Sequence, residues 1–131
     1  MADANIIFSA LIKKGLTSEI LFDNTFEFYS PDYLFQELRE HENILLKKTE
    51  RNRKEFNNLI LLLKNVIWVI NKKDYQAFFE LAKKHCPDTD DIPYFALAIK
   101  LNCPIWSNDK RLASQNKVKI FATAAILEIY F

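Results

Sequence analysis

Hydrophobic side chains recur three and four positions apart in several segments of the chain, which is the spacing of an α-helix. Residues 5–14 form the first such segment, and Gly15 is expected to end that helix in a left-handed conformation. Thr17 is positioned to cap a second, short helix. Apolar stripes over residues 56–63 and 75–82 predict two more helices.

Short apolar runs separate the helices and predict strands. The run VIWVI is rich in β-branched residues, as expected for a strand that is covered on both faces. Ser30 and Pro31 are typical of the N-cap and first position of a helix, and Thr123 is expected to cap a C-terminal helix. The predicted strands are residues 26–29, 66–70, 104–107 and 118–122, with a helix over 91–101 that Asn102 closes. This alternation indicates an α/β fold, with a mostly parallel sheet and helices on both faces.

The stretch KKTERNRKE, residues 47–55, is charged throughout. We interpret it as a solvated junction between two helices, with RNA contact as the alternative. The chain of 131 residues suits one core, so we expect a single domain over residues 1–131. Its 18 basic and 17 acidic residues give a net charge of +1, which argues neither for nor against a nucleic-acid partner.

The cysteines and glycines limit the function classes. Cys86 and Cys103 do not form a CxxC pair, which fits free thiols in a reducing compartment, although two cysteines can also pair. The only glycine, Gly15, excludes glycine-rich phosphate loops of the Walker or Rossmann type. No apolar run approaches the roughly 20 residues of a membrane helix, and no signal peptide is visible, so we expect a cytoplasmic protein without membrane association.

Four acidic residues are expected to lie near one edge of the sheet. Asp109 comes directly after the strand that contains Ile105 and Trp106, and Asp3 would lie at the carboxyl end of an N-terminal strand. Glu37 falls early in the helix after the FEFY strand, and Asp91 opens a later helix. Parallel sheets bind their ligands beyond the carboxyl ends of the strands, which is where we expect these side chains to gather.

Four carboxylates that crowd together repel one another unless a divalent cation neutralises them. Hard oxygen ligands of this kind suit Mg²⁺ or Mn²⁺. A metal held in this way activates water and stabilises charge on a phosphoryl oxygen, so the implied reaction is the hydrolysis of a phosphodiester.

Each acid also has an ordinary structural explanation. Asp3 and Asp91 are both suited to cap a helix or to interact with its dipole, and Asp109 is a common type of turn residue. Glu37 is compatible with a solvated helix surface, and Glu40 lies close enough to be the second acid in its place. The argument for a metal site therefore rests on the four residues together.

These residues resemble the PIN-domain family of metal-dependent ribonucleases, over the whole chain. The opening DANIIFSALIKKG is similar to the family's D-x-N followed by an apolar helix. The stretch DDIPYFALAIKLNCPIWSNDKRL is similar to its second signature, in which an Asp leads a helix and a strand then ends in [ST]-x-D. Here Asp91 leads that helix, and residues 107–109 form the end of the strand.

The resemblance implies a three-layer α/β/α sandwich with a parallel sheet of about five strands. It also implies that four acids hold the metal, directly or through water, while Asn5 and Ser107 orient these ligands from behind. The implied ligands are Asp3, Glu37, Asp91 and Asp109. Many relatives are toxins of toxin–antitoxin pairs, often homodimers that a small antitoxin protein inhibits, and others process RNA.

The N-terminus departs from the family pattern, because only Met1 and Ala2 precede Asp3 where relatives have four or five apolar residues. We expect a truncated first strand, a trimmed chain, or a start that lies upstream. A short strand would leave Asp3 on a frayed end and loosen the metal site.

Basic residues near the acids in sequence are candidates for contacts with RNA phosphates, with ordinary solvated cations as the equal alternative. They are Lys13, Lys14, Lys110 and Arg111. His41 and His85 have no partner at metal-binding spacing, and Trp106 is expected to lie in the core.

The leading hypothesis is a Mg²⁺- or Mn²⁺-dependent endoribonuclease whose products carry a 5′ phosphate and a 3′ hydroxyl. The first alternative is a non-catalytic module on the same scaffold that binds RNA or protein. The second alternative is a metal-dependent phosphatase on another α/β fold, which the lack of a D-x-D pair at the first strand disfavours.

Overall fold

The computed structural model describes residues 1–131, and its strands pair in parallel, as an α/β fold requires. Strand β1 (Phe28–Pro31) pairs with β2 (Ile67–Ile70), and β3 (Ile105–Trp106) pairs with β4 (Ile120–Phe121). Ala2 adds a single parallel bridge to Trp106. The structure therefore contains two two-stranded sheets and does not show the single sheet of about five strands that we expected.

The N-terminal segment pairs with the β3–β4 sheet alone. Its bridge to β3 consists of two backbone hydrogen bonds, from the Trp106 N–H to the Met1 carbonyl (2.6 Å) and from the Asp3 N–H to the Trp106 carbonyl (3.1 Å). No ladder joins this segment to β1, so hydrogen bonding does not continue from one sheet to the other.

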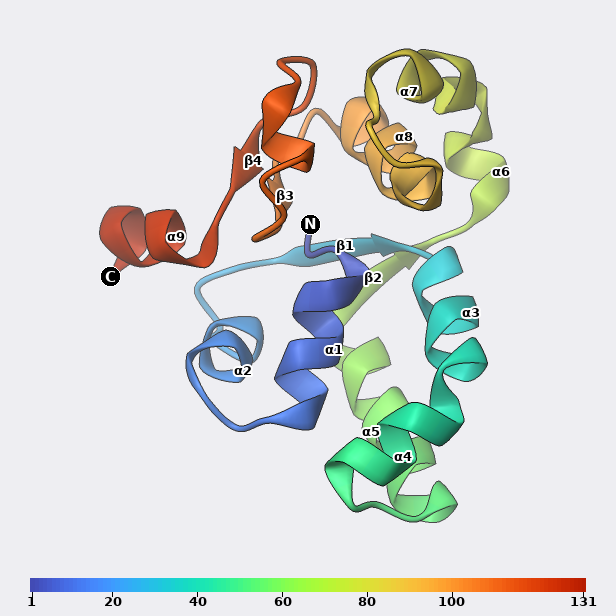
Figure 1. Cartoon of the computed structure of the whole chain (residues 1–131), viewed down its shortest axis with the longest axis vertical. Coiled ribbons are helices and arrows are strands. Elements are labelled where there is room, and N and C mark those ends of the chain that lie inside the picture. Colours follow the sequence, from blue (N-terminus) through green and yellow to red (C-terminus); the bar gives the residue numbers. More distant parts are fainter.

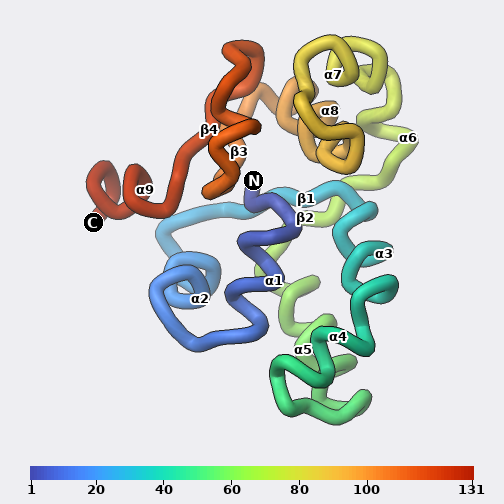
Figure 2. The backbone as a smooth tube through the Cα atoms, in the orientation of Figure 1, coloured from blue at the N-terminus to red at the C-terminus, as the bar shows by residue number.

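Helices lie on both sides of the β1–β2 sheet, and Figure 1 shows two groups of them. The first group consists of α1 (Ala4–Ile12), α2 (Leu16–Leu21), α3 (Tyr33–Glu40), α4 (Glu42–Thr49) and α5 (Arg53–Val66). Helix α9 (Thr123–Tyr130) lies to one side. The second group, which lies with β3 and β4 across the sheet from α1, is α6 (Lys72–Tyr75), α7 (Phe79–His85) and α8 (Ile92–Leu101). Short 3₁₀ turns occupy Gln76–Phe78, Thr89–Asp91 and Leu112–Ser114. The N-terminus lies centrally between the groups, and the C-terminus lies at the periphery (Figure 2).

The junction between the first two helices differs from the prediction. Helix α1 ends at Ile12, and Gly15 has an extended backbone (φ 177°), so it does not act as a left-handed C-terminal residue. Gly15 instead precedes α2, where its N–H donates a hydrogen bond to the Ser18 hydroxyl over 3.0 Å. Thr17 lies inside α2 and does not cap it, because both α1 and the start of α2 are shifted toward the N-terminus and Gly15 takes the N-cap position.

Two other predicted caps are part of different structures. Ser30 and Pro31 belong to β1, and Asp32 takes the N-cap position of α3. Thr123 starts α9 without capping it, and its hydroxyl accepts a hydrogen bond from the Trp106 indole N–H over 2.9 Å. The indole thus links β3 to the start of the C-terminal helix.

Other predicted boundaries are confirmed. Asn102 closes α8 in a left-handed conformation (φ 51°). The charged stretch 47–55 forms the junction between α4 and α5, where Glu50 is left-handed (φ 56°) and Asn52 caps α5 by accepting from the Glu55 N–H over 2.8 Å.

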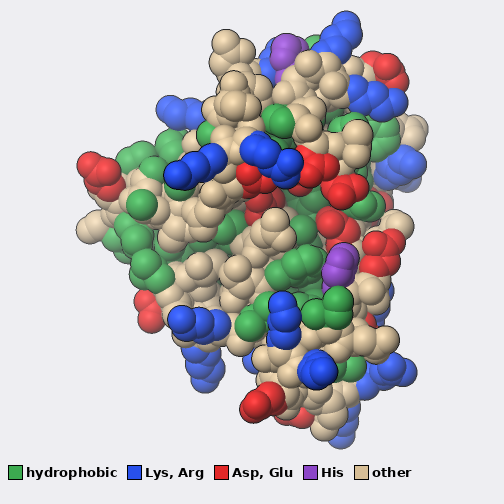
Figure 3. Space-filling model, in the orientation of Figure 1, with side chains coloured by type: hydrophobic (Ala, Val, Ile, Leu, Met, Phe, Trp, Pro, Cys, Tyr) green, Lys and Arg blue, Asp and Glu red, His purple; other side chains and the backbone are tan.

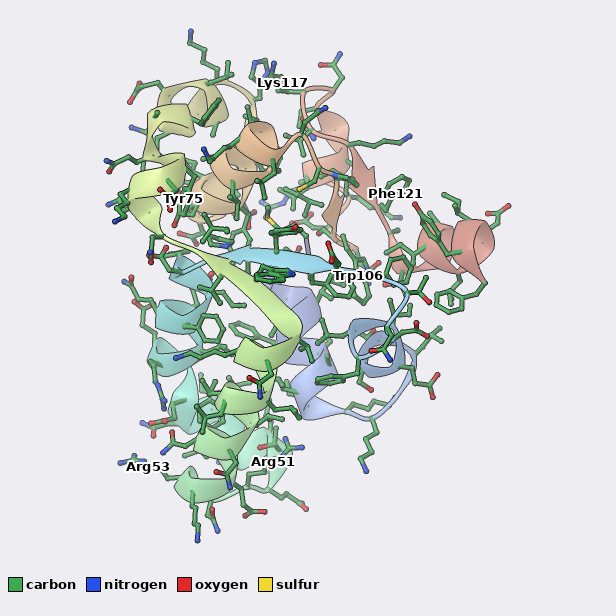
Figure 4. All side chains as sticks on the ribbon, turned by 180° about the vertical axis from the view of Figure 1, so that it is seen from behind. Arg51, Arg53, Tyr75, Trp106, Lys117 and Phe121 are labelled. Atoms are coloured by element: carbon green, nitrogen blue, oxygen red, sulfur yellow. The ribbon has the colours of Figure 1, made fainter.

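The core fills the space between the helices and the two sheets. Leu34, Leu38 and Leu97 are buried, and Trp106 lies behind β1 in the view from the rear (Figure 4). Strand β2 departs from the prediction of a strand covered on both faces, because 60% of Trp68 is exposed. With one neighbour, β1, and no further layer over Trp68, this strand lies at the surface. None of the helices combines the length and the apolar character that a membrane span requires.

Candidate active site

Asp3 is fixed by the bridge that joins the N-terminal segment to β3. Its side chain is buried and caps α1, because Oδ1 accepts a hydrogen bond from the Ile6 N–H over 2.9 Å. Burial raises the pKa of Asp3, a hydrogen bond with the Ser107 side chain opposes that rise, and the negative charge of Asp109 adds to it. The capping explanation therefore holds for Asp3, but it does not account for the neighbouring charge.

Glu37 lies on the face of α3 that points toward α8. The hydroxyl of buried Tyr94 donates a hydrogen bond to Glu37 Oε1 over 2.7 Å. Burial raises the pKa of Glu37, and the hydrogen bond from Tyr94 opposes the rise. Glu40 is exposed and accepts only a weak hydrogen bond from Gln36 (3.3 Å), so the structure favours Glu37 over Glu40 as the acid that faces the site.

Asp91 occupies the N-cap position of α8, but its side chain makes no capping hydrogen bond. Partial burial raises the pKa of Asp91 to about 7, far above its ordinary value of 3.8. Nearby carboxylates raise the pKa further; they are Asp88, Asp3, Asp109 and Glu37. Asp91 therefore makes no capping hydrogen bond, and its charge is coupled to those of the other three predicted acids.

The short strand β3 delivers Ser107 and Asp109 to the same place. Ser107 is 2% exposed, and its hydroxyl accepts a hydrogen bond from the Asp109 N–H over 3.1 Å. Asp109 also accepts from the Arg111 N–H over 2.9 Å, which is the turn role that its sequence position suggested. The Arg111 guanidinium lies 3.6 Å from Asp109 Oδ2 and 3.3 Å from Asp88 Oδ2.

The four predicted acids therefore come from four separate parts of the chain and influence one another electrostatically. Figure 3 shows acidic side chains gathered on the front face, near the N-terminal end of α1. Carboxylate oxygens are the donors that Mg²⁺ and Mn²⁺ prefer, and raised carboxyl pKa values mark a place where added positive charge is favourable. The donor set fits a divalent ion in its chemistry.

The side chains of the four predicted acids do not form a metal-binding group in this structure. No three His, Cys, Asp or Glu side chains converge closely enough to hold one ion together. The Tyr94 hydroxyl holds Glu37, whereas Asp91 makes no capping hydrogen bond that would oppose rotation of its side chain.

The predicted basic residues divide into two groups. Lys110 and Arg111 follow Asp109 directly and are exposed beside the acids. Lys13 and Lys14 lie beyond the opposite end of α1, roughly 15 Å from Asp3 at 1.5 Å per helical residue. The structure therefore does not bring these two lysines to the acidic cluster.

Two features of the site were missed by sequence reasoning or differ from it. Tyr94 was not predicted, although its place three residues after Asp91 on α8 is a helical spacing that faces the same way. The Asn5 side chain is exposed, and the hydrogen bond that Asn5 supplies to Asp3 comes from its backbone.

The model of the PIN domain matches residues 1–125, which is nearly the whole chain and includes all four acids. The chain belongs to the PIN-domain family.

PIN domains are generally nucleases, that is hydrolases of phosphodiester bonds, and generally use divalent metals. Membership agrees with the α/β arrangement and the parallel strand pairs of this PIN domain. No protein of curated function matches the sequence closely enough for a comparison at the level of individual activities.

Proposed function

We propose that this PIN domain is a Mg²⁺- or Mn²⁺-dependent endoribonuclease. The observation that carries the proposal is the environment of Asp91, whose pKa is raised to about 7 by burial and by surrounding carboxylates from other elements. Such an arrangement costs folding free energy, and functional sites are where costs of this kind concentrate.

The ligands in this proposal are Asp3, Glu37, Asp91 and Asp109. A divalent ion bound there supplies a Lewis acid that activates water and stabilises negative charge on the phosphate. Ser107 acts on two ligands at once: its hydroxyl accepts from the Asp109 backbone, and its side chain lowers the pKa of Asp3.

Three further residues position Glu37 and the RNA substrate. Tyr94 fixes Glu37 through its hydroxyl. Lys110 and Arg111 supply positive charge at the rim of the cluster, where they attract and position the RNA backbone. The expected products carry a 5′ phosphate and a 3′ hydroxyl.

An assay on single-stranded RNA with Mn²⁺ tests this function. We expect cleavage that EDTA abolishes and that falls at least 100-fold in Asp109→Asn and in Glu37→Gln. Glu40→Gln, three residues along the same helix, is the matched control and retains activity. Cleavage that persists in EDTA, or that is unchanged in Glu37→Gln and Asp109→Asn, overturns the proposal.

A second candidate is a non-catalytic module that binds RNA or protein on the same scaffold. The lack of three convergent ligands is the observation that favours it. Binding of RNA without cleavage under any metal, together with no detectable Mn²⁺ binding, would establish this candidate and reject the nuclease.

A toxin role extends the leading proposal to a biological setting. We propose that expression of this chain arrests growth and that an antitoxin protein relieves the arrest by covering the acids. We also propose that the chain forms a homodimer. Exposed apolar side chains on α5 and β2, namely Leu61, Leu62 and Trp68, support a surface for association. Light scattering of the purified chain and a growth assay with Asp109→Asn as the inactive control test these statements.

A further inference from the structure

A groove lies between α1 and α4. It has a volume of about 420 Å³, within the range of pockets that take small ligands. Asn5 at one end of the groove lies two residues after Asp3, and His41 lies one helical turn after Glu37. Through Asn5 and His41 the groove adjoins α1, which Asp3 caps, and the end of α3, the helix that carries Glu37.

The walls of the groove offer surfaces suited to a flat aromatic ring. The rings of Phe8 and His41 lie 5.4 Å apart with an angle of 47° between their planes. His41 Nδ1 lies 2.9 Å from the Glu37 carbonyl oxygen, which can only accept, so Nδ1 carries the hydrogen and the ring is held in place. Ile44, which is 55% exposed, adds an apolar surface opposite α1.

The far end of the groove is basic. Lys48 lines it, and a second hollow of about 370 Å³ continues along α1 past Ser9 and Ile12 to Lys13. The Arg51 guanidinium donates a hydrogen bond to the Leu11 carbonyl over 2.8 Å and adds another cation at this end of the helix. No acidic side chain lines either hollow.

The front face shows the same order of surfaces. In Figure 3, hydrophobic side chains lie below the acidic group, over α1 and α4, with Lys and Arg side chains beyond them. Polar groups that pair with base edges, aromatic and imidazole rings for stacking, and cations for phosphates are the features by which proteins bind single-stranded RNA.

We propose that the groove between α1 and α4 binds a nucleotide of single-stranded RNA next to the phosphate that is hydrolysed. The base stacks on His41 and Phe8, and the backbone continues toward Lys48 and Lys13. This inference rests on the proposed nuclease function, and it gives Lys13 a role at a distance from the acids.

The test measures RNA binding separately from cleavage. Fluorescence anisotropy in EDTA follows a fluorescein-labelled single-stranded RNA of about 12 nucleotides, a length suited to single-strand sites of this kind. His41→Ala is expected to raise the Kd about tenfold, and Phe8→Leu, which keeps an apolar side chain, severalfold. Lys48→Glu is expected to raise the Kd and to make binding less dependent on salt.

Matched controls come from α7, on the other side of the molecule. His85→Ala and Lys84→Glu alter the same residue types outside the groove and should leave the Kd within twofold of wild type. A duplex of the same sequence should bind more weakly and lose little affinity in His41→Ala, because its bases are not free to stack. Thermal melting confirms that each variant is folded.

The outcomes separate the two proposals. If the wild-type chain cleaves and binds RNA but His41→Ala and Lys48→Glu bind as tightly as wild type, the groove has another occupant, such as a protein segment, and this inference is overturned alone. If the chain neither binds nor cleaves RNA under any metal, the proposed function and this inference fall together.

Discussion

The hydroxyl of Tyr94 donates a hydrogen bond to Oε1 of Glu37 over 2.7 Å and thereby joins α8 to α3 beside the acidic cluster. Tyr94 is buried and Glu37 is half-buried, and burial raises the pKa of each. A carboxylate in this setting needs a donor to remain in a fixed orientation. Tyr94 is therefore the residue that positions Glu37.

Tyr94→Phe tests this role. We expect the free energy of unfolding to fall by about 1–3 kcal/mol, because a buried hydrogen bond to a charged group is lost. The acid limb of the pH–rate profile should move to higher pH, because the hydrogen bond holds down the pKa of Glu37. Tyr75→Phe, which removes a 2.6 Å hydrogen bond to Asp32 away from the acids, should lose stability without the shift in pH profile.

The raised pKa of Asp91 predicts a pH dependence of stability. The folded chain keeps a proton on Asp91 up to about pH 7, whereas the unfolded chain releases it near pH 4. Stability should therefore decrease as the pH rises between these values. In urea unfolding with EDTA, Asp91→Asn should gain more stability over wild type at pH 8 than at pH 5. An equal difference at both pH values would show that Asp91 is not electrostatically strained.

Ser107→Ala tests how the ligands are supported. Ser107 is buried, accepts a hydrogen bond from the backbone of Asp109 and lowers the pKa of Asp3, so its loss should weaken Mn²⁺ binding at least tenfold. Ser30→Ala is the matched control, because Ser30 is equally buried and its hydroxyl donates to the Pro31 carbonyl (3.1 Å) outside the cluster. Calorimetric titration measures both variants, and equal Mn²⁺ affinity in the two would contradict the account.

Arg111→Ala separates a contact with substrate from a contribution to folding. The Arg111 side chain is 69% exposed, so its ion pairs with Asp88 and Asp109 should contribute less than about 1 kcal/mol. The KM for RNA should rise severalfold while kcat changes less, because the guanidinium positions the backbone. Arg53→Ala, with 70% exposure and a 3.7 Å ion pair to Glu42, should leave the KM unchanged. Initial rates over a range of RNA concentrations provide the comparison.

The placement of the acids could be predicted from the sequence for a physical reason. A helix, a turn and a strand run out and back, so Asp91 at the start of α8 and Asp109 after β3 are expected at the same edge of the fold. The helix that separates them, closed by Asn102 in a left-handed conformation, was also visible in the pattern.

Other features depend on packing that a local pattern does not encode. The choice of Glu37 over Glu40 depends on the rotation of α3 against α8, and Tyr94 was an unremarkable aromatic residue until that rotation was known. The extent of the sheets depends on how far the N-terminal segment pairs, and one bridge at Ala2 does not extend the ladder. The distance of Lys13 from the acids follows from the straight course of α1.

The central claim is that acids remote in sequence hold one divalent ion together. Calorimetric titration with Mn²⁺ tests it most directly, with Asp90→Asn as the control, because Asp90 is exposed and adjacent to Asp91. The account predicts that wild type and Asp90→Asn bind Mn²⁺, while Asp91→Asn binds at least tenfold more weakly. Mn²⁺ binding that is absent from wild type, or unchanged in Asp91→Asn, would contradict it.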